Sequence, residues 1–313
     1  MRDVSTSLDM TRRRAAKIIG GAAAGSLLPL GPASARTAEM LTRPIPSSRQ
    51  KLPVIGLGTY QVFDVDLTQE NEKRLGDVLS LFVKLGGRVI DSSPMYGRAE
   101  EVIGALATKR GLHSRLFLAT KVWTHGREEG IRSMERSLAR LQTKRLDLMQ
   151  VHNLSDLGTQ LGTMRDWKAS GRFRYIGVTH YNVSGFAEIE KVLRAEQIDF
   201  LQINYSIMER EAEQRLLPLA QDRQVAVIVN RPFGGGDLFE RVRARPLPQW
   251  AAEFDCRSWA QFFLKWIVAH PAVTCAIPAT GNPRHLEDNM QGGRGRFPDA
   301  KTRARMVEFL ASA

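Results

Sequence analysis

Cysteine is scarce in this chain, and its scarcity limits the kinds of site that the chain can build. Cys256 and Cys275 are the only cysteines among 313 residues, and they form no CxxC motif. Two thiols are too few for a disulfide framework and lack the spacing of a metal centre. The six histidines show no ligand spacing either, so we expect no metal. Whether the two cysteines pair with each other is left open by the sequence.

Acidic and aromatic residues are also few. Asp and Glu number 33 against 45 Lys and Arg, which gives a net charge of +12, and aromatic residues make up 7%. A basic surface can bind nucleic acid, but no nucleic-acid-binding motif accompanies this charge. We therefore expect solvated surface charge and no nucleic-acid partner. The remaining composition, 43% hydrophobic and 25% charged, is typical of a folded globular protein.

The glycine-rich loops of the common nucleotide-binding folds are missing. The run Gly56–Gln61 (GLGTYQ) begins like the G-x-G-x-x-G fingerprint, but it has Gln in the sixth position and no helical pattern directly after it. No P-loop occurs elsewhere in the sequence. These observations exclude a Rossmann fingerprint.

The motifs in residues 1–35 follow one another in the order that is typical of a signal peptide. The segment Thr11–Lys17 (TRRRAAK) carries consecutive arginines, a weakly apolar run occupies residues 18–30, and Ala33–Ala35 (ASA) matches an A-x-A cleavage site. The apolar run is shorter than the roughly 20 residues that span a bilayer. The order is similar to that of twin-arginine export signals. A disordered basic tail with a chance cleavage motif is the alternative.

We therefore divide the chain into a signal peptide, residues 1–35, and a mature domain, residues 36–313. The signal implies the twin-arginine export machinery as a partner and a periplasmic location. It also implies no stable membrane anchor after cleavage. Such signals serve proteins that fold before export, often with a cofactor already loaded, which points towards an enzyme.

The mature chain alternates short apolar runs with amphipathic stretches. The runs are rich in Val, Ile and Leu, as expected of strands that are covered on both faces. Eight strands alternating with helices in about 260 residues predict an α/β fold, the (β/α)8 TIM barrel, whose usual size is about 250 residues. The expected strands are Val54–Thr59, Arg88–Ser93, Leu116–Val122, Leu146–Asn153, Tyr175–His180, Phe200–Ser206, Ala226–Pro232 and Val273–Ala279.

Amphipathic helices are expected between the strands. Apolar residues recur at helical spacing within residues 75–83, 131–141 and 186–193. The third of these stripes follows Ser184, which we expect to be its N-cap because a serine hydroxyl can accept from the first free backbone amides.

Ionisable residues end three consecutive strands on one face. With a period of two, the last residues on that face are Asp91, Lys121 and His152, and Tyr96 follows in the next loop. Because function in a barrel lies at the carboxyl ends of the strands, we expect the four side chains to meet there. The alternative is an Asp–Lys ion pair that fixes strand register beside a structural histidine.

Together the four residues have the chemistry of proton transfer to a carbonyl. A tyrosine is a weak acid, with a pKa near 10. An ammonium beside it lowers that pKa, and a carboxylate holds the ammonium in place. The tyrosine could then protonate a carbonyl oxygen while hydride reaches the carbon, and a neutral histidine would orient that oxygen.

The chain resembles the aldo-keto reductases over nearly all of its mature length. The motifs that carry the resemblance follow the family's order, and they are Gly56–Thr59, Asp91 with Tyr96-Gly97 and Glu100, Ala119–Trp123, Val151-His152, Gly177–His180, Gln202, and Ile277-Pro278 with Asn289. The resemblance implies NAD(P)H-dependent reduction of an aldehyde or ketone to an alcohol. It assigns Tyr96 as general acid, Asp91 and Lys121 as its support, and His152 as the residue that orients the substrate.

The resemblance also assigns a cofactor-binding half. The family's Ser-Asn pair and Gln, which hold the nicotinamide carboxamide, correspond to Thr179-His180 and Gln202. The family's stacking tyrosine after the seventh strand is absent from Asn230-Arg231-Pro232, where Arg231 could stack instead. His180 departs from the family because its ring cannot copy the paired donor and acceptor of an amide.

The cofactor phosphate is expected after the eighth strand. There Asn282 is a candidate N-cap with Pro at the first helical position, so that a helix N-terminus would face the phosphate. An ordinary turn is the alternative. Ala279 replaces the family's lysine, and Arg284 could supply the missing charge. We expect Thr280 and Asn289 to contribute as well, and we favour NADP(H) over NAD(H), which stays possible.

Three large side chains flank the expected site in the sequence, Tyr60, Met95 and Trp123, and we expect them to line the substrate pocket or to pack at its rim. A small carbonyl compound is the expected substrate. Two rivals remain: a nicotinamide-nucleotide-binding barrel without turnover, acting as a sensor or partner subunit, and a nicotinamide-independent lyase or isomerase that uses the same Tyr–Lys pair.

Overall fold

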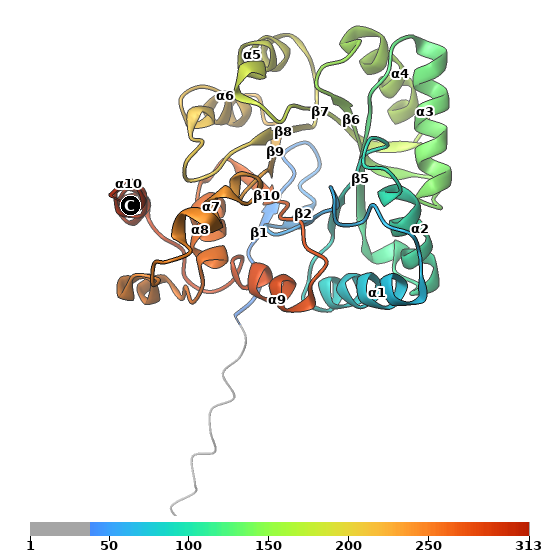
Figure 1. Cartoon of the computed structure of the whole chain (residues 1–313). Coiled ribbons are helices and arrows are strands. Elements are labelled where there is room, and N and C mark those ends of the chain that lie inside the picture. The colour runs from blue at the N-terminus through green and yellow to red at the C-terminus, as the bar shows by residue number, and fades with distance from the viewer. Residues whose placement is uncertain (1–37, 313) are drawn as a thin grey trace, which may run out of the picture. The chain divides into compact units, whose positions relative to one another are not determined.

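The computed structural model describes residues 38–312, and these residues form a barrel of eight parallel strands. The predicted signal peptide, residues 1–35, lies outside the described residues. The strands follow one another around the barrel in chain order (Figure 1). They are β3 (Leu57–Gly58), β4 (Val89–Asp91), β5 (Phe117–Val122), β6 (Leu146–His152), β7 (Phe173–Thr179), β8 (Phe200–Asn204), β9 (Ala226–Asn230) and β10 (Val273–Ala276).

Two isolated bridges bring the ends of this sheet together. Ile55 pairs with Ala276 and Gly58 pairs with Ala279, both in parallel, so that the first strand meets the last. All eight predicted strands are present, and the predicted (β/α)8 class is confirmed. The first is the shortest: of the expected Val54–Thr59 only two residues form a regular strand.

Helices surround the strands (Figure 1). The three stripes expected from the sequence lie in α1, α3 and α5. The helices of residues 38–312 are α1 (Gln69–Lys84), α2 (Ala99–Lys109), α3 (Arg127–Arg140), α4 (Leu157–Ala169), α5 (Phe186–Ala195), α6 (Leu216–Asp222), α7 (Asp237–Val242), α8 (Trp259–Val268), α9 (Pro283–Gln291) and α10 (Ala300–Ala311), with short 3-10 segments between some of them.

The expected cap of α5, Ser184, is wrong, because the N-cap residue of this helix is Gly185, which makes no side-chain hydrogen bond. A 3-10 turn, Val183–Gly185, precedes the helix, and the side chain of Asn182 accepts from the backbone N–H of Ser184 at 2.9 Å. Ser184 is therefore the capped residue and not the cap. An amide oxygen performs this task as well as a hydroxyl, and the sequence offered both within three positions.

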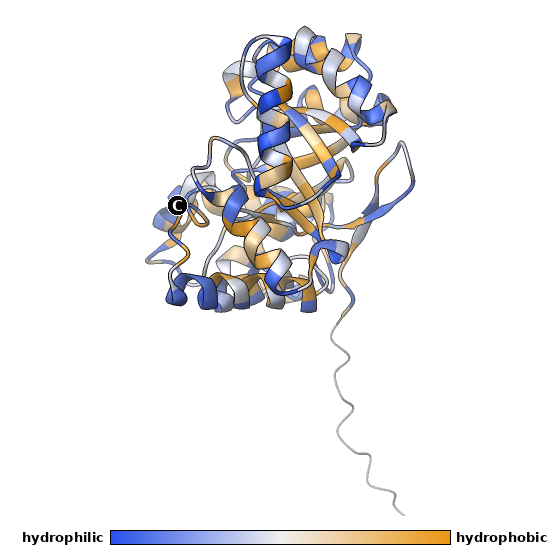
Figure 2. Ribbon diagram, turned by 90° about the vertical axis from the view of Figure 1, so that its right-hand side faces the viewer, coloured by the Kyte–Doolittle hydropathy of each residue, from blue (hydrophilic) through white to orange (hydrophobic). Residues whose placement is uncertain are grey.

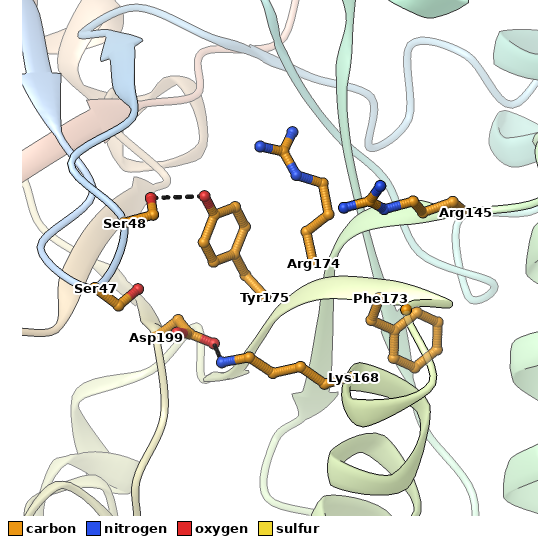
Figure 3. A pocket seen from close by; sticks show the side chains of 9 residues that line it. Ser47, Ser48, Arg145, Lys168, Phe173, Arg174, Tyr175 and Asp199 are labelled. Atoms are coloured by element: carbon orange, nitrogen blue, oxygen red, sulfur yellow. Dashed lines mark hydrogen bonds and ion pairs between the residues drawn. The ribbon is translucent and has the colours of Figure 1, made fainter.

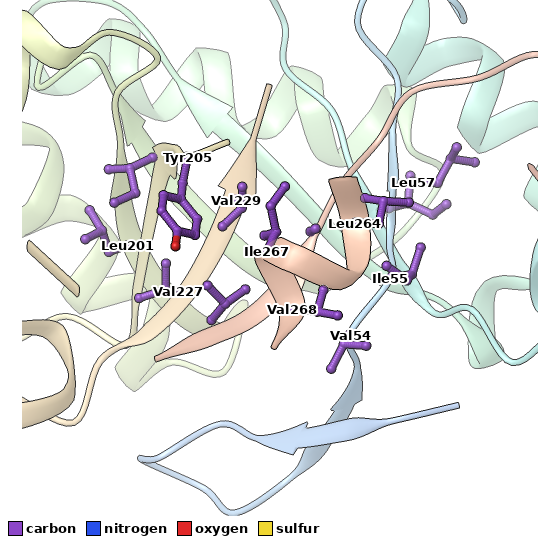
Figure 4. Close-up of a cluster of buried hydrophobic side chains, with 14 of the residues drawn as sticks. Val54, Ile55, Leu57, Leu201, Tyr205, Val227, Val229, Leu264, Ile267 and Val268 are labelled. Atoms are coloured by element: carbon purple, nitrogen blue, oxygen red, sulfur yellow. The ribbon is translucent and has the colours of Figure 1, made fainter. Parts of the chain in front are cut away.

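Hydrophobic side chains form two separate cores. Side chains on one face of each strand fill the space between strands and helices, and those on the other face fill the barrel. Figure 2 shows the hydrophobic residues concentrated on the strands. Figure 4 shows part of the outer core, in which Leu264, Ile267 and Val268 of α8 gather with Val227 and Val229 of β9 and with Val54 and Ile55.

A short hairpin closes the amino-terminal end of the barrel. Its strands, β1 (Thr42–Pro44) and β2 (Lys51–Pro53), are antiparallel and were not expected from the sequence. Ile45 and Leu52 join the inner core beside residues at the beginnings of the barrel strands, such as Phe117. The barrel is therefore sealed at this end, which leaves the carboxyl ends of the strands as its opening.

The two cysteines do not pair. Cys256 and Cys275 are both free and buried. Among the helices of residues 38–312, none combines the length and the apolar character needed to cross a membrane.

Candidate active site

Asp91 and Lys121 form an ion pair inside the open end of the barrel. Parallel pairing of β4 with β5 sets Asp91 beside Ala119, one inward position before Lys121. Lys121 Nζ donates to Asp91 Oδ2 at 2.6 Å and to the carbonyl oxygen of Ser92 at 2.7 Å. The two side chains are 1% and 3% exposed. A buried ion pair needs further hydrogen bonds to offset its desolvation, and this pair has them.

Two glutamines complete the shell of Asp91. Its Oδ1 accepts from Gln202 Nε2 at 2.7 Å and from Gln150 Nε2 at 3.2 Å. Gln150 was not among the predicted site residues, although it lies two positions before His152 on the same inward face. Three donors, the Lys121 ammonium and the two glutamine amides, therefore hold the Asp91 carboxylate in one place.

The Lys121 ammonium lies over the face of the Tyr96 ring. The centroid of that ring is 4.8 Å from Lys121 Nζ. The turn that carries the tyrosine is closed by a hydrogen bond from the Tyr96 N–H to the Ser93 carbonyl oxygen, and Gly97 follows with a φ of 55°. A Cβ at Gly97 would lie 2.1 Å from Asp64 Oδ1, so both the backbone angle and the space require glycine.

The pKa of the Tyr96 hydroxyl is shifted in the opposite direction to the one expected from the sequence. Burial raises the pKa of Tyr96 above its usual value, and the nearby Lys121 ammonium opposes that rise without cancelling it. The expected lowering by the lysine is therefore present, but desolvation of the phenolate outweighs it. Tyr96 is held in the protonated form that a proton donor needs.

His152 is kept neutral by its surroundings. Burial, with help from the charges of Lys121 and His180, lowers the pKa of His152 to about 3. Its Nδ1 lies 3.4 Å from Ser93 Oγ, and its ring meets the Tyr96 ring edge-on at 6.4 Å between centroids. The structure thus brings together all four predicted catalytic residues. Ser93 was missed, because a serine before a proline in a loop carries no signal of its own.

The three predicted pocket residues surround this group on its solvent side. Tyr60, Met95 and Trp123 are exposed large hydrophobic side chains. The Tyr60 ring lies 5.0 Å from the Tyr96 ring, and the Trp123 ring lies 6.4 Å from the His152 ring, between centroids. They form an apolar and aromatic rim next to the two proton-transfer residues.

The predicted carboxamide residues are arranged differently from the expectation. Thr179 Oγ1 donates to Gln202 Oε1 at 3.0 Å, and both side chains are buried. The Gln202 amide is thus engaged at both ends, by Thr179 and by Asp91. His180 turns to its own loop, where its Nδ1 lies 3.2 Å from the N–H of Asn182. Arg231 is exposed and has a φ of 48°.

The expected phosphate site has the predicted cap. The side chain of Asn282 accepts from the Arg284 N–H at 2.9 Å, and Pro283 begins α9. Arg284 is exposed, whereas Thr280 and Asn289 are buried. Sequence reasoning missed Arg74 of α1, whose guanidinium donates to the Gly281 carbonyl oxygen at 3.1 Å. A helix N-terminus with two arginines near it can accept a phosphate.

A cavity of about 400 Å³ lies at the opposite end of the barrel, away from these residues. It is lined by Ser47 and Ser48 of the hairpin loop and by residues that precede or begin strands, such as Arg145 and Phe173 (Figure 3). Lys168 is paired there with Asp199 at 2.6 Å. Because barrel chemistry sits at the carboxyl ends of the strands, we assign this cavity no part in the reaction.

Comparison with known proteins identifies the family. The family model described as "Aldo/keto reductase family" matches residues 54–304. Methylglyoxal reductase YeaE of Escherichia coli (strain K12) is 30% identical over 247 residues, with 76% of this chain and 84% of that protein covered. Glyoxal reductase of Bacillus subtilis (strain 168) is 26% identical over 244 residues, covering 76% and 82%.

A solved structure has the same architecture. An aldo-keto reductase from Klebsiella pneumoniae, solved in complex with NADPH, superimposes with a TM-score of 0.71 at 26% identity and covers 87% of this chain and 96% of that one. The matched family model spans most of the chain, including every barrel strand and the four clustered residues. The chain therefore belongs to the aldo/keto reductase family and is an NAD(P)H-dependent carbonyl reductase.

Proposed function

We propose that this enzyme reduces small aldehydes or ketones with NADPH and that Tyr96 donates the proton to the carbonyl oxygen. The observation that carries the proposal is the cluster of Tyr96 and His152 around the buried Asp91–Lys121 pair. A tyrosine held protonated beside a fixed cation has the arrangement that general acid catalysis of carbonyl reduction requires.

The side chains divide the work of proton transfer. A nicotinamide nucleotide, when bound, would supply the hydride for the carbonyl carbon. Tyr96 gives its hydroxyl proton to the carbonyl oxygen, and the Lys121 ammonium, 4.8 Å from the ring centroid, stabilises the phenolate that is left. Asp91 holds the ammonium in place through its 2.6 Å contact. A proton from solvent then restores Tyr96.

His152 orients the carbonyl oxygen as a neutral donor. Ser93 Oγ accepts from the Met95 N–H at 3.3 Å, so its own hydrogen is available for His152 Nδ1 at 3.4 Å. An Nδ1 that accepts leaves the proton on Nε2, where it can donate to the substrate. Ser93 would thus select the useful tautomer.

Residues at the mouth of the barrel fit a nicotinamide nucleotide with a 2′-phosphate. The capped N-terminus of α9, Arg284 and Arg74 supply donors and positive charge for phosphate. Gly281 leaves room for the Arg74 guanidinium, since a Cβ there would lie 2.4 Å from Arg74 Nη1. Two structural neighbours from Klebsiella pneumoniae contain NADP or NADPH, which supports NADP(H) for this chain, with NAD(H) as the alternative.

Relatives suggest the substrates to test first. Two relatives are named as methylglyoxal and glyoxal reductases, and we propose that this chain likewise accepts small 2-oxoaldehydes. The rim of Tyr60, Met95 and Trp123 adds apolar surface, which would favour aldehydes that carry an aromatic or aliphatic group over fully polar ones.

The test is NADPH oxidation against a panel of aldehydes, with wild type beside Tyr96→Phe. We expect turnover by the wild type and a loss of at least about a hundredfold in the variant, the usual scale of general acid catalysis. Equal rates in the two proteins would contradict the proposal. Binding of NADPH without turnover would favour the sensor or partner-subunit rival. Turnover with the nucleotide stripped away would favour the lyase or isomerase.

We also propose that the enzyme is exported to the periplasm through the twin-arginine machinery, supported by the order of motifs in residues 1–35. The double variant Arg12→Lys/Arg13→Lys should remain in the cytoplasm, because such signals depend on their arginines. Cell fractionation followed by immunoblotting measures this. Equal amounts of wild type and variant in the periplasm would contradict the export proposal and leave the enzymatic one intact.

A further inference from the structure

A buried amide without partners stands at the open end of β8. Asn204 is 1% exposed, yet neither its Nδ2 nor its Oδ1 has a hydrogen-bond partner within residues 38–312. Phe200 belongs to the inner core and Gln202 reaches Asp91, so the alternation of the strand also points Asn204 into the barrel. An unpaired buried amide is unfavourable, and such a group needs a polar partner that enters the barrel.

Asn230 lies beside Asn204 on the next strand. The two residues are direct partners in the register of β8 and β9. Asn230 Nδ2 donates to the His180 carbonyl oxygen at 3.3 Å and to Gln202 Oε1 at 3.5 Å. Its Oδ1 is buried and unpartnered in the described part of the chain. One donor group and two acceptors are therefore free in one corner of the barrel mouth.

This corner lies across the barrel from the proton-transfer residues. In the strand order, β8 lies four strands from β4, which carries Asp91, and β9 lies four strands from β5, which carries Lys121. Four strands is half of the circumference of an eight-stranded barrel. A flat ring held by Asn204 and Asn230 would therefore lie between these two residues and the site where Tyr96 and His152 receive the carbonyl.

The residues first expected to bind the carboxamide are engaged elsewhere. Gln202 uses its amide hydrogens on Asp91 and Gln150 and its oxygen on Thr179. His180 Nδ1 lies against its own turn at Asn182. Turning the Gln202 amide over would set its oxygen against the Asp91 carboxylate, so this orientation is fixed by electrostatic repulsion.

We propose that Asn204, with Asn230, binds the carboxamide of the nicotinamide ring. The inference rests on the proposed NADPH-dependent function. A carboxamide has one acceptor and two N–H donors, which complement Asn204 Nδ2, Asn204 Oδ1 and Asn230 Oδ1. Asn204 thus supplies the paired donor and acceptor that His180 lacks, and Asn230 supplies the second acceptor from a neighbouring strand.

The test measures dissociation constants of the purified full chain for three ligands. They are NADP⁺, its analogue with a carboxylate in place of the carboxamide (nicotinic acid adenine dinucleotide phosphate), and 2′,5′-ADP, which lacks the nicotinamide half. The wild type should prefer NADP⁺ over the carboxylate analogue by at least about tenfold, because the free Asn oxygens would repel a carboxylate.

Asn204→Leu should bind NADP⁺ about tenfold more weakly and lose most of that preference, while its affinity for 2′,5′-ADP stays unchanged. Gln197→Leu is the matched control, because it removes an exposed amide just before the other end of β8, and it should behave as wild type. Asn204→Asp, which keeps the shape but replaces the donor by an acceptor, should weaken NADP⁺ as well and is the second variant if the leucine substitution prevents folding.

Three results would overturn the inference. They are binding of all three ligands by Asn204→Leu as tightly as by wild type, equal losses of affinity for NADP⁺ and 2′,5′-ADP, and a change in the stability of the protein alone, as expected if an internal water satisfies the amide. Failure of the wild type to bind either NADP⁺ or 2′,5′-ADP would instead contradict the proposed function itself.

Discussion

Burial acts in opposite directions on the two residues that face the substrate carbonyl. It raises the pKa of the Tyr96 hydroxyl and lowers the pKa of the His152 imidazole to about 3. Both shifts disfavour the charged form. At neutral pH both residues are consequently neutral donors, and the permanent charge of the site is carried by the Asp91–Lys121 pair below them.

Removing the lysine from that pair should lower both the free energy of unfolding and the activity. Lys121→Met leaves the Asp91 carboxylate buried without its cation, and we expect a loss of about 3–5 kcal/mol in the free energy of unfolding, together with loss of activity. Urea denaturation measures the stability. The control Lys73→Met breaks a surface pair with Asp77 whose side chains are 79% and 42% exposed, and it should cost less than about 1 kcal/mol. Equal losses in the two variants would contradict the prediction.

His152 should make the protein sensitive to acid. Its pKa in the folded chain, about 3, lies below the usual 6.5, so between these values the unfolded chain binds a proton that the folded chain does not. Stability therefore falls as the pH is lowered below 6.5, by about 1.4 kcal/mol per unit. Urea denaturation of wild type and His152→Gln at pH 7 and pH 5 isolates this contribution. A stability difference between the two proteins that is the same at both pH values would show that His152 is not responsible.

At the scale of elements, each functional residue depends on how a strand ends and a helix begins. Asp91 is the last residue of β4, His152 of β6, Asn204 of β8 and Asn230 of β9. The strands supply fixed positions in the barrel, and the following loops supply Tyr96 and the rim. This division explains why chemistry gathers at one end of the fold.

The cap of α9 should matter for both stability and phosphate binding. Asn282→Ala removes the 2.9 Å contact to the Arg284 N–H, and we expect a loss of about 1 kcal/mol in the free energy of unfolding. It should also weaken binding of 2′,5′-ADP several-fold, because the helix N-terminus is no longer held for the phosphate. Isothermal titration calorimetry and urea denaturation measure the two effects.

Asp299→Ala is the matched control, since Asp299 caps α10 through a 2.8 Å contact to the Thr302 N–H. It should cost similar stability without any change in binding of 2′,5′-ADP. If both variants weaken the ligand alike, the cap of α9 has no specific part in phosphate binding.

The barrel strands could be predicted from the sequence because each lies in a short run of buried, largely apolar residues between amphipathic stretches. The period of two in a strand placed Asp91, Lys121 and His152 on one face. The hairpin β1–β2 could not be predicted, because each of its strands has three residues and ends in a proline. Asn204 could not be predicted either, since its unpaired state depends on what β7 and β9 place beside it.

Gln202 and Asn204 show a second limit of prediction from the sequence. The family motif singles out Gln202, but only the folded chain reveals that its amide is held by Asp91 and Thr179. Side chains two positions apart on one strand face the same way, and a pattern in the sequence cannot tell which of them has free hydrogen-bonding groups.

At the scale of the whole molecule, the two ends of the barrel have separate tasks. The hairpin seals the amino-terminal end with Ile45 and Leu52, and the carboxyl end carries the proton-transfer cluster and the unpaired amides. If the chain is exported as proposed, nicotinamide nucleotide is expected to be scarce at its destination. Tight binding at the mouth would then let the folded enzyme carry its cofactor across the membrane.

Separation of the two ends predicts that the seal can be weakened without loss of ligand binding. Ile45→Ala removes a fully buried side chain from the inner core, and we expect it to cost about 2–5 kcal/mol in the free energy of unfolding. Ile45→Val, which removes a single methylene, should cost about 0.5–1.5 kcal/mol.

Both variants should bind NADP⁺ with the affinity of wild type at temperatures where they remain folded, because their cavities lie several residue layers below the mouth. Urea denaturation and titration with NADP⁺ check the two halves of the prediction. A loss of affinity that grows with the size of the cavity would mean that packing at the sealed end sets the geometry of the mouth, and that the two ends of the barrel are coupled through the inner core.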